Sequence, residues 1–352
     1  MIPSTMRAWR THEYGPRPTE VLHLDNVAVP EPAAGELLVE VHAIPLNLND
    51  LERINGGNMM VQPELPYSPG MEVFGVVVAA GEGAQERLGD RVVAVTKAAS
   101  GGYSEYAICP EVSAFEMPND VTLPDAAALF FPYHLAWLGL IDRADLQPGE
   151  SVLIHAAAGG SGTAAIQIAK HVGARVFATA GTDEKAQLCR ELGADVAVNY
   201  NTEDFAAVIR SETGGRGVDV VFDNVGESVM EASLASTAYN GRYLMMGFAS
   251  NKAVADEKFI VPRRIALGNI KLCGVLLAYA DEATGAFVKE MMGWNFPPSA
   301  LGAAITQQIL TLYRSGVLRP VIGQEASFEE LPQAIEAMAN RNTVGRTVVR
   351  VK

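Results

Sequence analysis

A glycine-rich turn at residues 155–165 is the segment with the clearest chemical meaning. It reads "HAAAGGSGTAA" and contains Gly160-x-Gly162-x-x-Ala165 between an apolar strand candidate and a helix candidate. Glycine allows a tight turn and close approach of the backbone to a pyrophosphate, and the small third residue allows close helix packing. The N–H groups of the first helical turn would face the phosphates. We predict a dinucleotide site; the alternative is a tight strand-to-helix turn without a ligand.

The residues after the next predicted strand indicate which dinucleotide binds. An acid at the tip of that strand would bind the ribose hydroxyls of NAD, but the strand ends as "FATAGT" at residues 177–182. Asp183 and Glu184 come only in the first turn of the following helix, where they complement the helix dipole. Lys185 beside them is a cation suited to a 2′-phosphate. We therefore predict NADPH rather than NADH.

Two patterns of predicted elements must position these residues. Residues 6–109 alternate short β runs with turn residues, whereas the chain after Pro124 alternates apolar strands, turns and helices. The strand candidates of this second region begin near Ser151, Arg175, Asp195, Val218, Arg242 and Ile270. Such alternation favours a parallel, doubly wound α/β sheet. A final strand, "GRTVVRV" at residues 345–351, is expected to rejoin the first region.

Composition excludes several classes of protein. The chain has 352 residues, a net charge of −14, 19% charged and 49% hydrophobic residues. The length predicts two domains, and the acidic balance argues against nucleic acid as a partner. Cys109, Cys189 and Cys273 are too far apart in sequence for a C-x-x-C motif. Because we find no signal peptide and no run suited to a membrane, we predict a cytoplasmic protein.

Short motifs distributed over nearly the whole chain indicate a family. They are Asn47-Leu48-Asn49-Asp50, Tyr67-Ser68-Pro69-Gly70, Gly89-Asp90-Arg91-Val92, Gly101-Gly102-Tyr103-Ser104-Glu105-Tyr106, His155-Ala156-Ala157-Ala158-Gly159-Gly160, Asp223-Asn224-Val225-Gly226 and Val344-Gly345-Arg346. In these motifs the chain resembles the zinc-free medium-chain dehydrogenase/reductases of the quinone oxidoreductase and zeta-crystallin branch. The resemblance implies a GroES-like β-rich domain and a Rossmann domain with six parallel strands, with the nicotinamide in the cleft between them.

The resemblance also gives expected domain boundaries and site residues. Residues 1–128 would form the GroES-like domain, residues 129–279 the Rossmann domain that binds NADPH, and residues 280–352 a return to the GroES-like domain. The expected cofactor contacts are Ala158, Gly159, Gly160, Ser161, Gly162, Gly181, Thr182, Lys185, Tyr200, Asn224, Gly247, Phe248 and Arg341. Asn47 and Asp50 would face the nicotinamide ribose and the substrate, orienting the ring rather than transferring protons. The alternative for this N-x-x-D pair is a turn whose side chains bond the local backbone.

The metal site of the zinc-using relatives is missing from the sequence. Those relatives have a cysteine near the position of Asn47 and a histidine in a "GHE" run, whereas this chain reads Gly70-Met71-Glu72. We therefore expect no metal. The chain also carries Glu52 and Leu135 where relatives often have tyrosine and threonine, so these two positions depart from the family pattern.

These observations predict a zinc-independent, NADPH-dependent oxidoreductase that hands a hydride to a quinone or a small α,β-unsaturated carbonyl compound. The alternatives are an enoyl-thioester reductase and a non-catalytic, crystallin-like protein that binds NADPH. The partners would be a small-molecule electron acceptor and a second copy of the chain, with neither nucleic acid nor membrane involved. We expect the homodimer to form through Ile270 to Leu277, an apolar edge of the sheet, unless a helix or the C-terminal segment covers that edge.

Overall fold

The computed structural model describes residues 1–57, 63–246 and 262–352, and they divide into two compact units. The first unit contains residues 1–130, 278–307 and 322–352. The second contains residues 131–277 and 308–321. Each unit has its own core and its own main sheet.

The division differs from the expected boundaries at residues 308–321. The expected boundaries gave all of 280–352 to the GroES-like domain, whereas this segment belongs to the second unit. The division falls inside helix α11 (Ser299–Arg314). Beyond α11, the Gln167 side chain accepts a hydrogen bond from the Arg319 backbone N–H at 2.7 Å and donates one to the Arg319 carbonyl at 3.1 Å. These two bonds tie the segment to the second unit, although nothing in its pattern of apolar residues indicates them.

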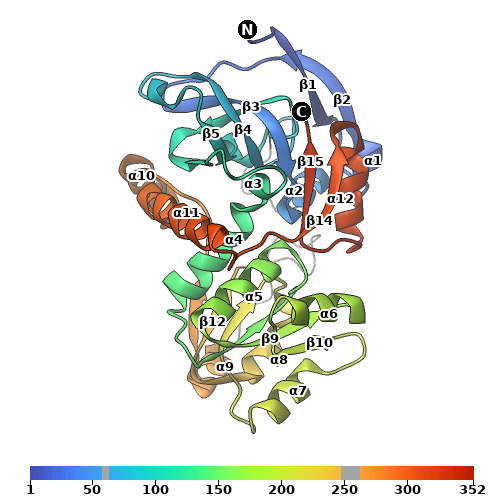
Figure 1. The fold of residues 1–352 in the computed structure, drawn as a ribbon, viewed down its shortest axis with the longest axis vertical. Helices are drawn as coiled ribbons and strands as arrows, with labels where there is room; N and C mark the ends of the chain where they lie inside the picture. The colour runs from blue at the N-terminus through green and yellow to red at the C-terminus, as the bar shows by residue number, and fades with distance from the viewer. Residues whose placement is uncertain (58–62, 247–261) are drawn as a thin grey trace. The chain divides into compact units, whose positions relative to one another are not determined.

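The second unit is built on a six-stranded parallel sheet (Figure 1). Its strands are β8 (Ser151–Ile154), β9 (Arg175–Ala180), β10 (Val196–Asn199), β11 (Val218–Asp223), β12 (Thr237–Met245) and β13 (Lys271–Gly274), in the order β10-β9-β8-β11-β12-β13. All the pairs are parallel, which confirms the predicted doubly wound α/β sheet. Strands β8 and β11 are buried at every residue, as expected for a sheet that is covered on both faces.

Helices alternate with these strands and are ended by local capping residues. They are α4 (Phe131–Trp137), a π-helical turn at Leu138–Arg143, α5 (Gly160–Val172), α6 (Asp183–Glu191), α7 (Phe205–Glu212), α8 (Glu227–Ala235) and α9 (Pro262–Gly268). Thr182 and Asp204 cap α6 and α7 by accepting backbone N–H groups, and Gly173 ends α5 in the left-handed conformation. Within the described part of the chain, no helix combines the length and the apolar content needed to cross a bilayer.

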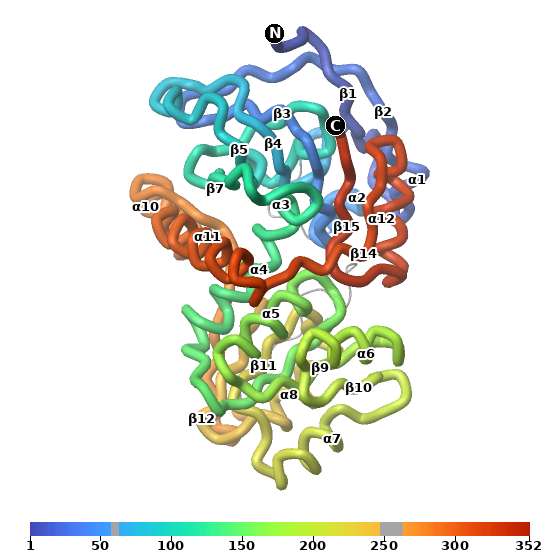
Figure 2. The backbone as a smooth tube through the Cα atoms, viewed as in Figure 1, coloured from blue at the N-terminus to red at the C-terminus, as the bar shows by residue number. Residues whose placement is uncertain are grey.

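The first unit contains a seven-stranded mixed sheet. Its strands are β3 (Glu36–Pro45), β4 (Glu72–Ala80), β5 (Arg91–Val95), β6 (Tyr106–Pro110), β7 (Ala114–Glu116), β14 (Ile322–Ser327) and β15 (Arg346–Arg350). Two further strands, β1 (Thr5–Thr11) and β2 (Leu22–Ala28), pair with each other, and the helices are α1 (Pro18–Val21), α2 (Leu48–Asn55), α3 (Asp125–Ala128), α10 (Glu282–Met292), the start of α11 and α12 (Leu331–Ala339). Strand β15 runs antiparallel to β3, which confirms the predicted return of the C-terminal strand (Figure 2).

A buried ion pair fixes β15 to the N-terminal part of this unit. Arg346, the first residue of β15, contacts Glu72, the first residue of β4, at 2.5 Å, and Glu72 is fully buried. The Asn47 amide bridges the pair, because its nitrogen donates to Glu72 at 2.9 Å and its oxygen accepts from Arg346 at 2.9 Å. Arg346 also donates to the Leu46 carbonyl at 3.1 Å. We refer to Asn47, Glu72 and Arg346 as the buried triad.

Removing one charge of the triad leaves the other buried and uncompensated. We therefore expect Glu72→Ala to lower the free energy of unfolding by about 3 to 5 kcal/mol, measured by denaturant titration. The matched control is Glu325→Ala, which breaks a half-exposed ion pair between Glu325 of β14 and Arg350 of β15. This variant should cost about 1 kcal/mol or less. Similar losses in the two variants would contradict this assignment.

Candidate functional site

The turn between β8 and α5 presents backbone N–H groups without a side-chain cap. Gly159 is the residue that precedes α5, and it has no side-chain oxygen with which to satisfy the first turn of the helix. The Gly159 N–H donates to the Ala156 carbonyl at 3.0 Å and its carbonyl accepts from Thr163 at 2.9 Å, so the turn is closed on itself. Uncapped N–H groups and the positive end of the helix dipole suit a phosphate.

The glycines of this turn have different roles. A Cβ on Gly162 would lie 2.4 Å from the Ala156 oxygen and 2.5 Å from the Ala157 Cα, so the absence of a side chain is required by the protein's own loop. Gly162 is the second glycine of the motif, the position that the motif assigns to close approach of the backbone to a pyrophosphate. A Cβ on Gly159 would meet only the Ala156 oxygen, at 3.3 Å, so the space beside Gly159 is nearly open. Of these two glycines, Gly159 therefore leaves more room for close approach of a pyrophosphate to the backbone.

His155 supports this turn from the core. Its ring nitrogens contact the Thr179 hydroxyl at 2.9 Å and the Ser233 hydroxyl at 2.7 Å, and the side chain is buried. Burial lowers the pKa of His155 to about 3, so the imidazole is neutral at physiological pH. Both ring nitrogens are therefore engaged by hydroxyl groups inside the core. His155 acts as a buried structural residue rather than as an acid catalyst.

The loops after β9 and β10 bring together four residues predicted to bind the cofactor. The Thr182 hydroxyl accepts from the Lys185 N–H at 3.2 Å, which fixes the start of α6. The Tyr200 hydroxyl lies 2.7 Å from the position a Cβ would take on Gly181. Gly181 therefore leaves room for the tyrosine. The carboxyl edge of the parallel sheet thus holds Gly181, Thr182, Lys185 and Tyr200 in one place.

Asn224 follows β11, the neighbour of β8 on the side where the strand order reverses. The turn that holds it is organised by Asp223, whose carboxylate accepts from the N–H groups of Val225 at 2.7 Å and Gly226 at 3.0 Å. Tyr243 donates its hydroxyl to the same carboxylate. Burial raises the pKa of Asp223. Ligands of doubly wound sheets bind at this reversal, so the position of Asn224 fits a cofactor contact.

Three predicted cofactor residues are not among those that the described part of the second unit brings together. Gly247 and Phe248 fall outside the described residues. Arg341 belongs to the first unit, where it follows α12 with a φ of 58° and its N–H donates to the Met338 carbonyl at 3.0 Å. The second unit therefore brings together the residues from Ala158 to Asn224, and Arg341 stays a separate prediction.

Asn47 and Asp50 occupy the N-terminal end of α2 in the first unit. Asp50 is fully buried, and its carboxylate accepts from the backbone N–H groups of Asn47 at 3.1 Å and Met71 at 3.0 Å and from the Tyr103 hydroxyl at 3.1 Å. Burial raises the pKa of Asp50 to about 6. The bond from the Asn47 N–H to Asp50 is local, as in the turn alternative, whereas the bonds from Met71 and Tyr103 join Asp50 to distant parts of the unit. Asn47 additionally belongs to the buried triad.

Several residues with structural importance for these sites carried no role in the sequence interpretation. The sequence patterns assign no role to Glu72, Tyr103 or Arg346. They also assign none to the two asparagines that flank Tyr200. The signal available for Glu72 was a charged residue at the start of an otherwise apolar strand. Asn199 and Asn201 gave no such signal, because asparagine after a strand is ordinary turn chemistry.

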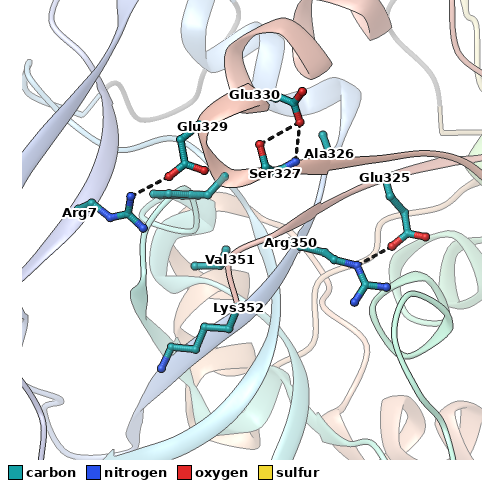
Figure 3. Close-up of a pocket in the computed structure, with 10 residues that line it drawn as sticks. Arg7, Glu325, Ala326, Ser327, Glu329, Glu330, Arg350, Val351 and Lys352 are labelled. Carbon is teal, nitrogen blue, oxygen red and sulfur yellow. Dashed lines mark hydrogen bonds and ion pairs between the residues drawn. The ribbon is translucent and has the colours of Figure 1, made fainter.

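A shallow hollow of about 440 Å³ lies on the first unit, between β1, β14 and the end of β15 (Figure 3). Its charged side chains are engaged with one another or with neighbours: Arg7 pairs with Glu105 and Glu329, and Arg350 pairs with Glu325 at 2.6 Å. Among the described residues, none of the predicted site residues lines this hollow. In the same part of the chain, no three His, Cys, Asp or Glu side chains are grouped so that they could hold a metal ion.

Comparison with known proteins assigns both units to one class. Residues 33–119 match the alcohol dehydrogenase GroES-like domain, and residues 160–291 match the zinc-binding dehydrogenase family. With the mixed sheet of the first unit and the Rossmann sheet of the second, these matches define a medium-chain dehydrogenase/reductase.

Individual relatives narrow this class. Human quinone oxidoreductase is 35% identical over 333 residues, which cover 94% of this chain and 93% of the relative. The structure of Escherichia coli quinone oxidoreductase complexed with NADPH has a TM-score of 0.83 at 28% identity and covers 99% of this chain and 100% of that one. The structure of mycobacterial Rv1454c complexed with NADPH has a TM-score of 0.83 at 31% identity. The match covers 98% of this chain and 100% of that one. The chain belongs to the quinone oxidoreductase family of zinc-free medium-chain dehydrogenases and reductases.

The buried carboxyl of Asp50 gives a prediction about pH. Its pKa is about 6 in the folded protein against an ordinary value of 3.8, so between these values the folded state binds the proton more readily than the unfolded state. The stability contributed by Asp50 is therefore greatest in acid and falls as the pH rises through 6. Denaturant titrations should show that, between pH 4 and pH 7, the free energy of unfolding of the wild type falls by up to about 3 kcal/mol relative to that of Asp50→Asn. A difference that does not change with pH would contradict this assignment.

Proposed function

We propose that the protein is an NADPH-dependent reductase that transfers a hydride to a quinone or a small α,β-unsaturated carbonyl compound without zinc. The observation that carries the proposal is the open, uncapped turn at Gly159, next to loops that offer Lys185 and no acid at the tip of β9. The NADPH carried by the two solved relatives supports the choice of cofactor. The three thiols, which form no disulfide, are consistent with a cytoplasmic location.

In this proposal the chain's residues act by binding and orientation. The first turn of α5 would hold the pyrophosphate at Gly159 and Gly160, and Lys185 with Tyr200 would hold the adenosine phosphate. NADPH, when bound, supplies the hydride from C4 of its nicotinamide. An acceptor carbon that is already electron-poor needs no Lewis acid, so positioning supplies most of the rate.

The test is an acceptor panel with purified protein. Loss of NADPH absorbance is followed with a quinone, a small enone and an enoyl thioester, each with NADPH and with NADH. We expect turnover of the quinone or the enone and a preference for NADPH. Preferred turnover of the thioester would favour the enoyl reductase, and absence of turnover with retained NADPH binding would favour the non-catalytic alternative.

We also propose that two chains associate through the edge of the parallel sheet. Strand β13 is the last strand in the order, and Leu272 within it and Leu276 just after it are 40% and 49% exposed. The strand itself is shorter than the expected run from Ile270 to Leu277 and covers Lys271–Gly274. Pairing of two such edges would satisfy the hydrogen-bonding groups of both chains and bury these leucines.

The outer N–H groups of β13 follow from its pairing with β12. Val275 donates its N–H to the Met245 carbonyl of β12 at 3.1 Å, so by alternation the N–H of Leu272 points to the outer edge. We expect light scattering to give twice the chain mass of 37.5 kDa for wild type and a single chain mass for Leu272→Pro, which removes that donor. The control Leu272→Ala keeps the N–H group and should stay dimeric. A wild-type mass of one chain at micromolar concentration would refute this interface.

A further inference from the structure

The loops after β9 and β10 are held together by a set of polar contacts that we call the asparagine clasp, made by Asn199 and Asn201. Asn199 ends β10 directly opposite Ala180, which ends β9. Its side-chain nitrogen donates to the Asp183 carboxylate at 2.8 Å. The side-chain nitrogen of Asn201 donates to the Gly181 carbonyl at 2.7 Å. The clasp therefore holds the Gly181 backbone in the loop after β9 and the Asp183 side chain at the start of α6.

The Asn199 amide is oriented by its own loop. Its side-chain oxygen accepts the Asn201 N–H at 3.1 Å, and its backbone carbonyl accepts the N–H groups of Thr202 at 3.0 Å and Glu203 at 2.9 Å. Because the amide oxygen is engaged by an N–H donor, the NH₂ group must face Asp183. Asn199 is 7% exposed, so its side chain is confined by the surrounding protein. The donor that meets the Asp183 carboxylate is thus set in advance.

The position of Asp183 matters for the kind of dinucleotide that fits. It is the first acid after β9 and stands at the start of α6, three residues beyond the strand tip at which NAD-binding sheets carry an acid for the ribose 2′-hydroxyl. A carboxylate free to turn toward that hydroxyl would accept its hydrogen bond and would repel a 2′-phosphate in the same place. A carboxylate held by Asn199 has one oxygen engaged with the neighbouring loop.

We infer that Asn199 is a specificity-determining residue that favours NADPH over NADH by holding the Asp183 carboxylate against the loop after β10. This inference rests on the proposed function, because it concerns the selectivity of the same cofactor site. It assigns the selectivity to two features: the cation of Lys185, which attracts the phosphate, and the restraint of Asp183, which removes a competing acid.

The test uses the full-length protein and the ratio of the dissociation constants for NADH and NADPH, measured by titration of the fluorescence of each dinucleotide. In Asn199→Leu the Asp183 carboxylate is released, and we expect the preference for NADPH to fall about tenfold, equivalent to about 1.4 kcal/mol. The second variant, Asn199→Ser, keeps a short acceptor for the Asn201 N–H but cannot reach Asp183. It should lower the ratio in the same direction. A structural loosening alone would weaken both dinucleotides in parallel and leave the ratio unchanged, which would overturn the inference.

Removal of the released charge should restore the selectivity. We expect Asn199→Leu combined with Asp183→Asn to return the ratio to that of Asp183→Asn alone. The matched control for the charge change is Asn199→Leu combined with Glu191→Gln, at the far end of α6, which should leave the ratio low. Failure of Asp183→Asn to restore the ratio, or equal restoration by Glu191→Gln, would overturn the role of Asp183.

The same titrations separate this inference from the proposed function. A wild type that binds NADPH selectively but reduces no acceptor would overturn the proposed reductase activity while the Asn199 variants still test the inference. A wild type with normal reductase activity and an unchanged ratio in the Asn199 variants would overturn the inference alone. A wild type without a preference for NADPH would overturn the proposed cofactor and the inference together.

Discussion

A carboxylate withdrawn from water needs either a counter-charge or a proton, and the first unit buries two of them within one small region. Glu72 has the counter-charge, because Arg346 comes from the far end of the chain to meet it. Asp50 accepts hydrogen bonds from backbone and tyrosine donors instead, and burial raises its pKa to about 6. Asn47 contacts both carboxylates, through its amide and its backbone N–H. The entry to α2, the start of β4 and the placement of β15 all depend on this arrangement.

The second unit is organised by a geometric constraint instead of a charge. In a parallel sheet the carboxyl ends of all strands meet at one edge, so segments separated by many residues become neighbours there. Short polar contacts join several of these segments, and the turn after β11 is held by Asp223 within itself. His155 links β8 to β9 and α8, and the asparagine clasp links β9 to β10. The glycine turn is one part of a connected edge.

The sequence was sufficient to predict whatever depends on periodicity or on a local motif. The starts of five parallel strands lay within about one residue of those observed, the glycine turn was found by its spacing, and the return of β15 was expected from its apolar pattern. The meaning of Gly162, the donors around Asp50 and the partner of Asp183 were not predictable in this way. Each depends on which loops become neighbours, and that information lies in strand order and register. The bonds between Gln167 and Arg319, which help to tie residues 308–321 to the second unit, likewise join residues that are far apart in the chain.

The position of β15 has a consequence for how the protein is made. Strand β15 lies between β14 and β3, and β14 has no other partner in the sheet order. A nascent chain emerging from the ribosome can complete β3, β4 and β5 early, yet it carries an unneutralised Glu72 and leaves residues 43–45 of β3 without their β15 partner until residues 346–350 have been synthesised. The first unit can therefore close only after residues 346–350 have been synthesised, whereas the strands of the parallel sheet have all emerged some 70 residues earlier. During that interval the incomplete sheet is the part of the chain that most needs protection from pairing with other strands.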